Sequence, residues 1–193
     1  MMRLMAILGY HTNPLYISTE PRTKSLGVTV ANINESKHST TFNDLVATVM
    51  VRVAGHCTEK YNPNDMKIVK DGNYTLGAMS DFEGITNVVR LYIQSGIDVS
   101  SGMIYTHGKE LTNKEIDRIN EFIKIIYEKT HLLLQNKKIK KLFLKFIKKL
   151  KSQKRKEFFF NAETLEEFVP SSFENELNIF WRNEILIPNL MCF

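Results

Sequence analysis

The sequence predicts a mainly α-helical domain with a small β element near its N-terminus. Apolar side chains recur at helical spacing in four segments, at about residues 42–53, 82–93, 116–134 and 139–150. β-Branched and aromatic residues gather instead in two short stretches, 15–18 and 26–30, which residues 21–24 separate. A hairpin or edge pair of strands is therefore expected before the long helices.

The first eight residues are apolar but too short to cross a membrane. They contain one arginine and no small-residue cleavage site, which argues against a signal peptide and favours a short core helix. The first long helix is expected to begin after Thr41, where Phe42 starts the apolar period. Asp44 lies three residues after Thr41, close to a capping-box arrangement.

Turn-forming residues place the next boundaries. Clusters of Asn, Asp, Pro and Gly predict a loop over residues 61–76, and a polar, glycine-containing stretch predicts a second loop over 98–110. Between the loops a helix is expected from Asp81 to about Ser95, because Gly96 is a natural stop.

Two further helix starts are expected from capping residues. Thr112 and Glu115 form the Thr-x-x-Glu pattern of a capping box, so a long helix should follow and continue to about residue 135. A second helix should follow it directly, with lysines on one face. A last helix is expected near Thr164, which heads a similar pattern with Glu167.

The composition is that of an ordinary globular protein. The chain has 193 residues, of which 43% are hydrophobic and 24% charged, so one domain with a real core is expected. Cys57 and Cys192 form neither a CxxC pair nor a disulfide framework, which favours a reducing compartment. We therefore expect an intracellular location, in the cytoplasm or in an organelle such as a mitochondrion or plastid.

Positive charge is concentrated in one segment. Residues 137–156 carry 11 basic and no acidic side chains, whereas residues 157–193 carry 7 acidic and one basic. The remaining residues are neutral overall, so the net charge of +5 comes from Lys137–Lys156. Two readings stay open: a solvated helix face that also pairs with the acidic segment 157–184, or a surface for nucleic acid or anionic lipid.

Three short motifs occur in a suggestive order. They are PRTKSLGVT at 21–29, AGHCTEK at 54–60 and GAMSDFEG at 77–84, followed by a long helical pair. Their order and spacing resemble the peptidase domain of the FtsH family, the membrane-anchored AAA zinc metalloproteases, whose pattern is roughly PRGxxLG, GGRxAEE and GAxxDL. The resemblance covers about residues 1–169 and implies a helical FtsH-type peptidase-like domain. It leaves residues 170–193 as a hydrophobic C-terminal tail, which we expect to dock by packing against this chain or against another.

The resemblance implies a zinc site of which this sequence holds one element. In the family, two histidines of a helical HExxH and the Asp of GAxxD hold zinc, and the Glu is the general base. Asp81 matches that Asp. No HExxH occurs in the sequence, and by spacing from Pro21 the motif would end at about Met1 or before it.

Other positions also depart from the family pattern. The five histidines are scattered, with no two at i and i+4, at positions 11, 38, 56, 107 and 131. Thr23 replaces the Gly after Pro-Arg, and His56 replaces the Arg of GGR. No Walker A motif and no AAA module are present, so ATP binding by this sequence is not expected.

The candidate ligands therefore have structural alternatives. Asp81 is either a third zinc ligand, which needs two partner ligands from another chain or an upstream piece, or a carboxylate stabilising a helix start. Glu59 has a family counterpart, but a solvated or ion-paired helix end explains it at least as well. His56 and Cys57 are adjacent and cannot form a tetrahedral site alone. We assign no catalytic or cofactor-binding residue, and expect zinc only if another chain supplies the missing ligands.

Three hypotheses for the function follow. The first is a degenerate or incomplete FtsH-type metalloprotease domain that acts as a non-catalytic subunit or scaffold in a larger oligomeric assembly, associated with a membrane only through its partners. The second is the C-terminal piece of a split ATP-dependent zinc metalloendopeptidase. The third is a basic helical module that binds RNA or anionic lipid through Lys137–Lys156.

Overall fold

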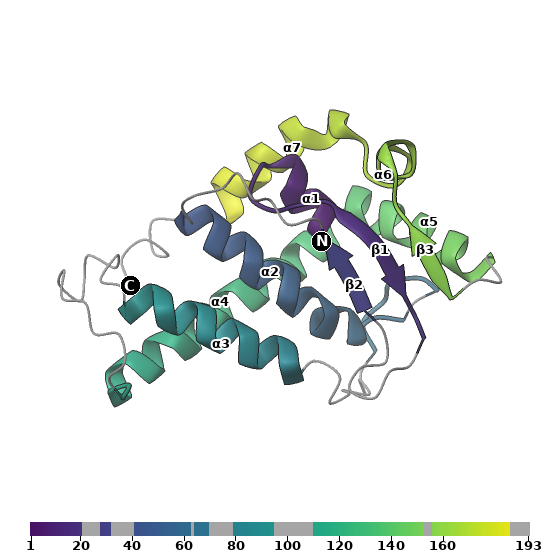
Figure 1. The fold of residues 1–193 in the computed structure, drawn as a ribbon. Helices are drawn as coiled ribbons and strands as arrows, with labels where there is room; N and C mark the ends of the chain where they lie inside the picture. The colour runs from purple at the N-terminus through teal and green to yellow at the C-terminus, as the bar shows by residue number, and fades with distance from the viewer. Residues whose placement is uncertain are drawn as a thin grey trace.

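A computed structural model describes seven stretches of the 193-residue chain: 1–20, 28–31, 41–62, 64–69, 79–94, 110–152 and 156–185. These residues are mainly helical and include a small three-stranded antiparallel sheet (Figure 1). The predicted fold class is confirmed. The predictions on residues 21–27, 63, 70–78, 95–109, 153–155 and 186–193 lie outside the described residues, as do His38 and Cys192.

The elements follow one another in the order labelled in Figure 1. They are α1 (Met2–Ile7), β1 (Pro14–Ser18), β2 (Val28–Ala31), α2 (Phe42–Glu59), α3 (Met79–Gln94), α4 (Asn113–Gln135), α5 (Lys137–Ser152), β3 (Glu157–Phe159), α6 (Ala162–Phe168), η3 (Ser171–Phe173), α7 (Glu174–Phe180) and η4 (Trp181–Ile185). No helix in the described part of the chain combines the length and apolar character needed to cross a membrane.

Helix α2 is the centre of the core. It begins as predicted: the backbone N–H of Thr41 donates to the Asp44 carboxylate over 2.8 Å, and the Asp44 N–H donates to the Thr41 hydroxyl over 3.3 Å. Its apolar face packs against α3 and α4, and five of its buried residues are Leu45, Val46, Val49, Met50 and Val53. Helix α4 begins with the predicted capping box of Thr112 and Glu115. Both helix starts are therefore confirmed.

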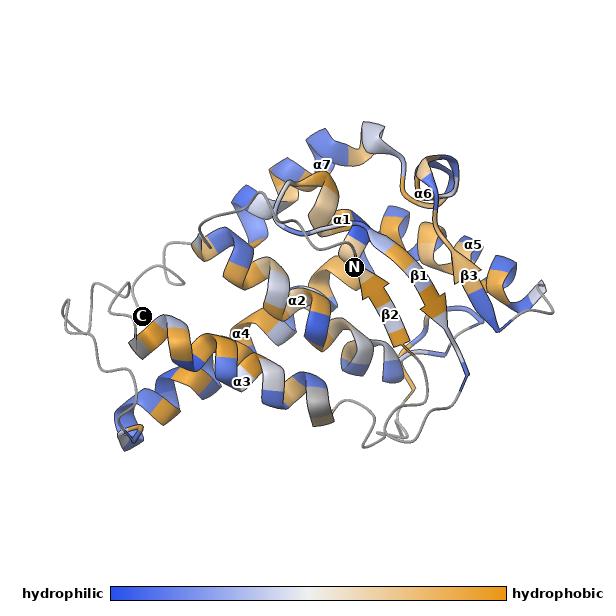
Figure 2. Ribbon diagram, in the orientation of Figure 1, coloured by the Kyte–Doolittle hydropathy of each residue, from blue (hydrophilic) through white to orange (hydrophobic). Residues whose placement is uncertain are grey.

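The sheet joins residues from the two ends of the chain. Its strand order is β2-β1-β3, so β1 is central and pairs antiparallel with both neighbours. The β1–β2 pair agrees with the predicted hairpin, and Ile17 lies opposite Thr29. On the other side Ile17 lies opposite Phe158 of β3, a strand that the sequence pattern does not predict. Figure 2 shows that the strands are largely hydrophobic.

The last helices fold back onto the N-terminal part of the chain. Trp181 and Ile185 are buried in the main core, and the Trp181 ring lies 5.1 Å from that of Tyr10. Arg3 joins α1 to the segment that follows α6. Its guanidinium donates to the Val169 carbonyl over 3.3 Å and to the Ser171 hydroxyl over 3.0 Å.

The expected start of the last predicted helix needs a correction. Helix α6 begins at Ala162, and its N-cap is Asn161, whose side chain accepts from the Thr164 N–H over 2.8 Å. Thr164 is the third helical residue and completes the capping box by accepting from the Asn161 N–H. Asn161 caps the helix because its amide oxygen reaches an N–H group that has no partner within the helix.

Candidate functional site

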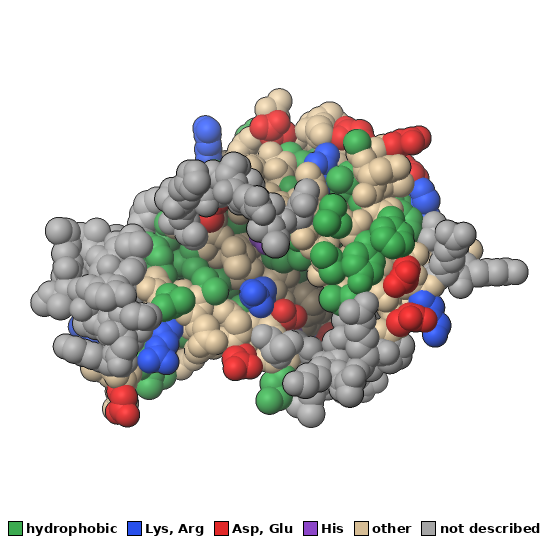
Figure 3. Space-filling model, viewed as in Figure 1, with side chains coloured by type: hydrophobic (Ala, Val, Ile, Leu, Met, Phe, Trp, Pro, Cys, Tyr) green, Lys and Arg blue, Asp and Glu red, His purple; other side chains and the backbone are tan. Residues whose placement is uncertain are grey.

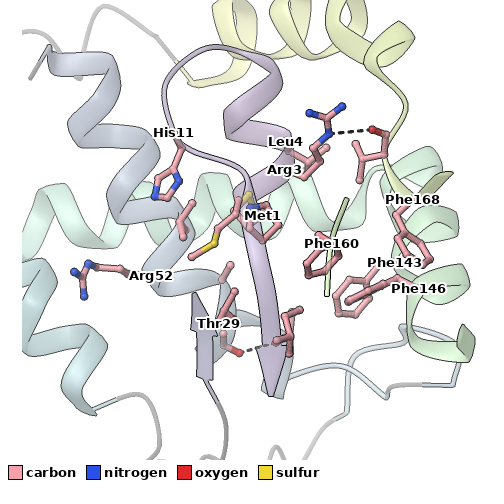
Figure 4. Close-up of a pocket in the computed structure, with 18 of the residues that line it drawn as sticks. Met1, Arg3, Leu4, His11, Thr29, Arg52, Phe143, Phe146, Phe160 and Phe168 are labelled. Atoms are coloured by element: carbon pink, nitrogen blue, oxygen red, sulfur yellow. Dashed lines mark hydrogen bonds between the residues drawn. The ribbon is translucent and has the colours of Figure 1, made fainter. Parts of the chain in front are cut away.

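A groove of about 880 Å³ lies between α2, the sheet, and helices α5 and α6. The face drawn in Figure 3 is hollowed near its middle, where charged and hydrophobic side chains meet. Figure 4 shows 18 of the residues that line it. The groove has a polar end on the α2 side and an aromatic end on the α5 side, and its lining residues come from both halves of the sequence.

The aromatic end is held by a cluster of phenylalanines. Phe146 of α5 contacts Phe168 of α6 with ring centroids 4.9 Å apart, and Phe160 at 5.9 Å. Phe158 of β3 is buried and packs edge-on against Phe146, Phe160 and Phe168. Edge-to-face aromatic pairs add to the energy of burial. The cluster therefore joins β3 and α6 to α5 and forms a rigid wall of the groove.

The polar end gathers residues from the start of the chain just before α1, the loop after α1, strand β2, and helices α2 and α3. His11, Thr29, Arg52 and Asp81 all line it, together with Met1. In Figure 4, Arg52 extends from α2 away from the sheet, and His11 projects from the loop that follows α1. This end presents one cation and one carboxylate that belong to neighbouring helices.

Asp81 lies in the first turn of α3, as the helix-start interpretation predicts. One of its carboxylate oxygens is 3.7 Å from the Arg52 Nη1, so the two form a half-exposed ion pair. Burial raises the pKa of the Asp81 carboxyl, and the Arg52 guanidinium lowers it in part. The positive end of the α3 dipole also favours a carboxylate at this position.

Gly84 leaves room for the Arg52 side chain to lie against α3. A Cβ atom at residue 84 would stand 2.5 Å from the Arg52 Nη1 and 3.0 Å from its Cζ. The guanidinium therefore lies directly against the α3 backbone, one turn after Asp81. A glycine is needed here for close approach, because only a residue without a side chain leaves room for the guanidinium.

We expect Gly84→Ala to break the Arg52–Asp81 pair without destabilising the fold. The methyl group would displace only the end of a flexible arginine, while Ala stabilises a helix interior by roughly 0.5–1 kcal/mol relative to Gly. The free energy of unfolding should stay equal or rise by up to about that amount. Denaturant titration measures it, and the NMR pH titration of the Asp81 carboxyl should shift upward. A large loss of stability would show that the close approach supports the fold itself.

The described residues do not fit a zinc ion on their own. Asp81 offers one carboxylate, and a guanidinium already lies beside it, whereas zinc sites use three or four protein ligands. In the parts of the chain that the structure describes, no three His, Cys, Asp or Glu side chains gather as a metal site would require. We derive no chemical step through zinc from this site.

The other sequence-predicted candidates lie on the last turn of α2. His56 Nδ1 is 3.4 Å from the Glu59 carboxylate, and its ring packs edge-on against Phe82. This agrees with the interpretation of Glu59 as part of an ion-paired helix end. Cys57 is buried, and burial raises the pKa of its thiol to about 12. That thiol is protonated at neutral pH, so it is neither a nucleophile nor a ready metal ligand.

A second polar cluster lies where the end of α2 meets α4, and the sequence pattern did not single it out. The Tyr61 hydroxyl and His131 Nδ1 form a hydrogen bond of 2.8 Å. The Tyr127 ring packs edge-on against His131 at 4.8 Å, and Lys60 lies 4.8 Å from the Tyr127 ring centre. Burial lowers the pKa of His131, and the charges of Lys60 and His56 lower it further.

This shift predicts a pH dependence of stability. Since the pKa of His131 is lower in the folded state than the unfolded value of about 6.5, the unfolded chain binds the proton more readily at mildly acidic pH. The contribution of neutral His131 to the free energy of unfolding is therefore fully present above about pH 6.5. It is lost as the pH falls through the pKa of His131 in the folded state. We expect His131→Gln to flatten the decline of the free energy of unfolding below about pH 6.5. Denaturant titrations at several pH values measure this, and an unchanged profile would contradict it.

No protein-family model matches the chain, and no curated protein matches it either. The resemblance to the FtsH peptidase domain therefore stays a prediction that depends on the three motifs. Each motif contributes some of its described residues to one place in the structure. Val28 and Thr29 of the first motif, Gly55 and Thr58 of the second, and Asp81 of the third all line the same groove.

Proposed function

We propose that this chain is a non-catalytic FtsH-type peptidase-like domain that serves as a subunit or scaffold in a larger assembly, in the cytoplasm or an organelle. Its groove receives a segment of a partner polypeptide. The observation that carries the proposal is that each of the three family-like motifs contributes at least one described residue to the lining of that one groove. Segments that are far apart in sequence and meet at one surface are what a shared binding site requires.

The contact of Asp81 with Arg52 supports the non-catalytic part of the proposal. The Arg52 guanidinium neutralises the carboxylate and lies against Gly84, so it occupies space beside the position that the resemblance assigns to a metal. A cation in this place disfavours a second cation by like-charge repulsion. Asp81 thus contributes to the packing of α3 against α2.

The shape of the groove supports a polypeptide as the occupant. In the described sheet, β2 pairs with β1 alone, so its other side is an edge where an extended segment could add by main-chain hydrogen bonds. Next to that edge the groove is lined mainly by apolar side chains, and its far end is aromatic. An extended peptide with spaced apolar side chains matches both features.

The proposal is tested by binding of a reduced, carboxymethylated protein, which stays unfolded and carries apolar segments. Fluorescence anisotropy should report its binding to the full chain. Thr29 is exposed on β2 and lines the groove, so Thr29→Arg should weaken binding at least tenfold while the circular dichroism spectrum is unchanged. The matched control is Ile179→Arg, at an exposed position of α7 that does not line the groove. Equal effects of the two variants would contradict the proposal.

The split-enzyme alternative is favoured by one observation. Asp81 lines the same groove as Met1 and Met2 of the α1 segment, so ligands from a second polypeptide would enter there to join it. Metal analysis of the intact assembly distinguishes the two proposals. Stoichiometric zinc that is lost with Asp81→Asn would support the split enzyme, and an assembly without zinc would support the scaffold.

A further inference from the structure

Helix α5 carries two sets of lysines that differ in their partners. On one flank, Lys138 pairs with Glu176 of α7, and both Lys145 and Lys149 pair with Glu167 of α6. Lys145 also donates to the Glu167 carbonyl over 3.1 Å. The acidic segment that follows α5 therefore neutralises this flank, as one reading of the charge distribution predicts.

The second set forms a row of exposed lysines without such partners. Lys137, Lys141 and Lys148 lie within about 40° of one another around the helix, since each residue turns by about 100°. All three are exposed, and the structure gives them no ion pair with any described residue. Lys140 lies beside them; it is half-buried and likewise has no ion partner among the described residues. The row extends over about 16 Å of the helix axis.

The apolar face of α5 points the other way and is already used by the fold. Ile139 is buried, Phe143 packs against the core, and Phe146 belongs to the aromatic cluster. An interfacial membrane helix needs its apolar face free to enter lipid. In α5 that face is occupied, so the exposed lysines act without apolar insertion.

We propose that the lysine row (Lys137, Lys140, Lys141 and Lys148) binds the phosphate backbone of duplex nucleic acid without reading bases. Lysine ammonium groups contact phosphates as point charges, and residues 137–152 contain no arginine, whose planar guanidinium favours bidentate contacts. Backbone contacts of this kind position a protein on a duplex irrespective of sequence. This interaction is independent of the groove and its occupant.

The test is fluorescence anisotropy with a labelled 20-base-pair duplex over a range of salt concentrations. Four phosphate contacts predict a slope of log K against log[salt] of about −3.6, which corresponds to a roughly 100-fold loss of affinity between 50 and 200 mM salt. Lys137→Gln, Lys141→Gln and Lys148→Gln combined should weaken binding at least tenfold and reduce the slope to about −0.9.

A charge-matched control separates the row from net charge. Lys138→Gln, Lys145→Gln and Lys149→Gln combined remove the same charge from the paired flank, and should weaken binding no more than about threefold. Equal losses in the two triple variants would overturn the proposal, as would no binding at 50 mM salt. Duplex DNA and duplex RNA probes of two sequences should bind alike within each type. Preferential binding to vesicles with phosphatidylserine over both duplexes would assign the row to a membrane surface instead.

Discussion

Replacing Trp181 with alanine should lower the free energy of unfolding by about 3–5 kcal/mol, the range for truncating a large buried aromatic residue. Trp181 is only 2% exposed and lies in the main core, where its ring packs against Tyr10. It joins the C-terminal helices to α4 and to the loop after α1. The substitution would therefore open a cavity at the point where the two ends of the chain meet.

Urea titration followed by circular dichroism measures this loss. Ile179→Ala is the control, since Ile179 lies in the neighbouring helix and is 62% exposed, and it should cost less than about 1 kcal/mol. Trp181→Phe keeps most of the ring and should cost less than Trp181→Ala. The Trp181 indole N–H is buried without a hydrogen-bond partner among the described residues, so removing that group carries little penalty. A loss below 1 kcal/mol for Trp181→Ala would contradict the burial of Trp181 in the main core.

The second large effect is expected at Phe158. Phe158→Ala should lower the free energy of unfolding by about 3 kcal/mol and release β3 and α6 from the rest of the protein. Phe158 is 6% exposed and contacts three phenylalanine rings while its strand pairs with β1. Amide hydrogen exchange should therefore become faster in β3 and α6 of the variant. In α2 and α4 it should stay as slow as in the unsubstituted protein.

Phe159 provides the matched control for this experiment. It is the next residue on the same strand, but it is 68% exposed and contacts Tyr16 on the other face of the sheet. Phe159→Ala should cost less than about 1 kcal/mol. Similar losses at the two positions would mean that the aromatic cluster does not hold the sheet to α5.

The helices could be predicted because their signals are local. The capping boxes at Thr41 and Thr112 and the apolar period of α2 and α4 use residues three or four positions apart. The starts of α2 and α4 are therefore correct to the residue. At α6 the same reasoning chose Thr164 and missed Asn161, since both residues are good caps and one turn contains both.

The third strand could not be predicted because its pairing is not local. β3 has three residues and is stabilised by β1, about 140 positions earlier in the sequence. Its only local signal is a group of three phenylalanines after the lysine-rich helix. Of these three residues, Phe160 lines the aromatic end of the groove and Phe158 packs against it, so part of that end was also missed.

The candidate site was predicted in part. Asp81 was identified from its motif, and the structure places it in the groove at the start of α3. Arg52 was missed, although its guanidinium pairs with that carboxylate and partly offsets the rise in pKa that burial causes. Its role follows from the packing of α2 on α3 and from the space above Gly84, neither of which has a sequence signature.

Proteolysis by the purified chain tests the central claim most directly. The chain would be incubated with zinc and a fluorescently labelled, unfolded protein, with and without a chelator, and the products followed by electrophoresis. We predict that the unfolded protein is bound and stays intact under all conditions, and that Asp81→Asn changes nothing in the cleavage assay. Zinc-dependent cleavage that the chelator stops and Asp81→Asn abolishes would contradict the account.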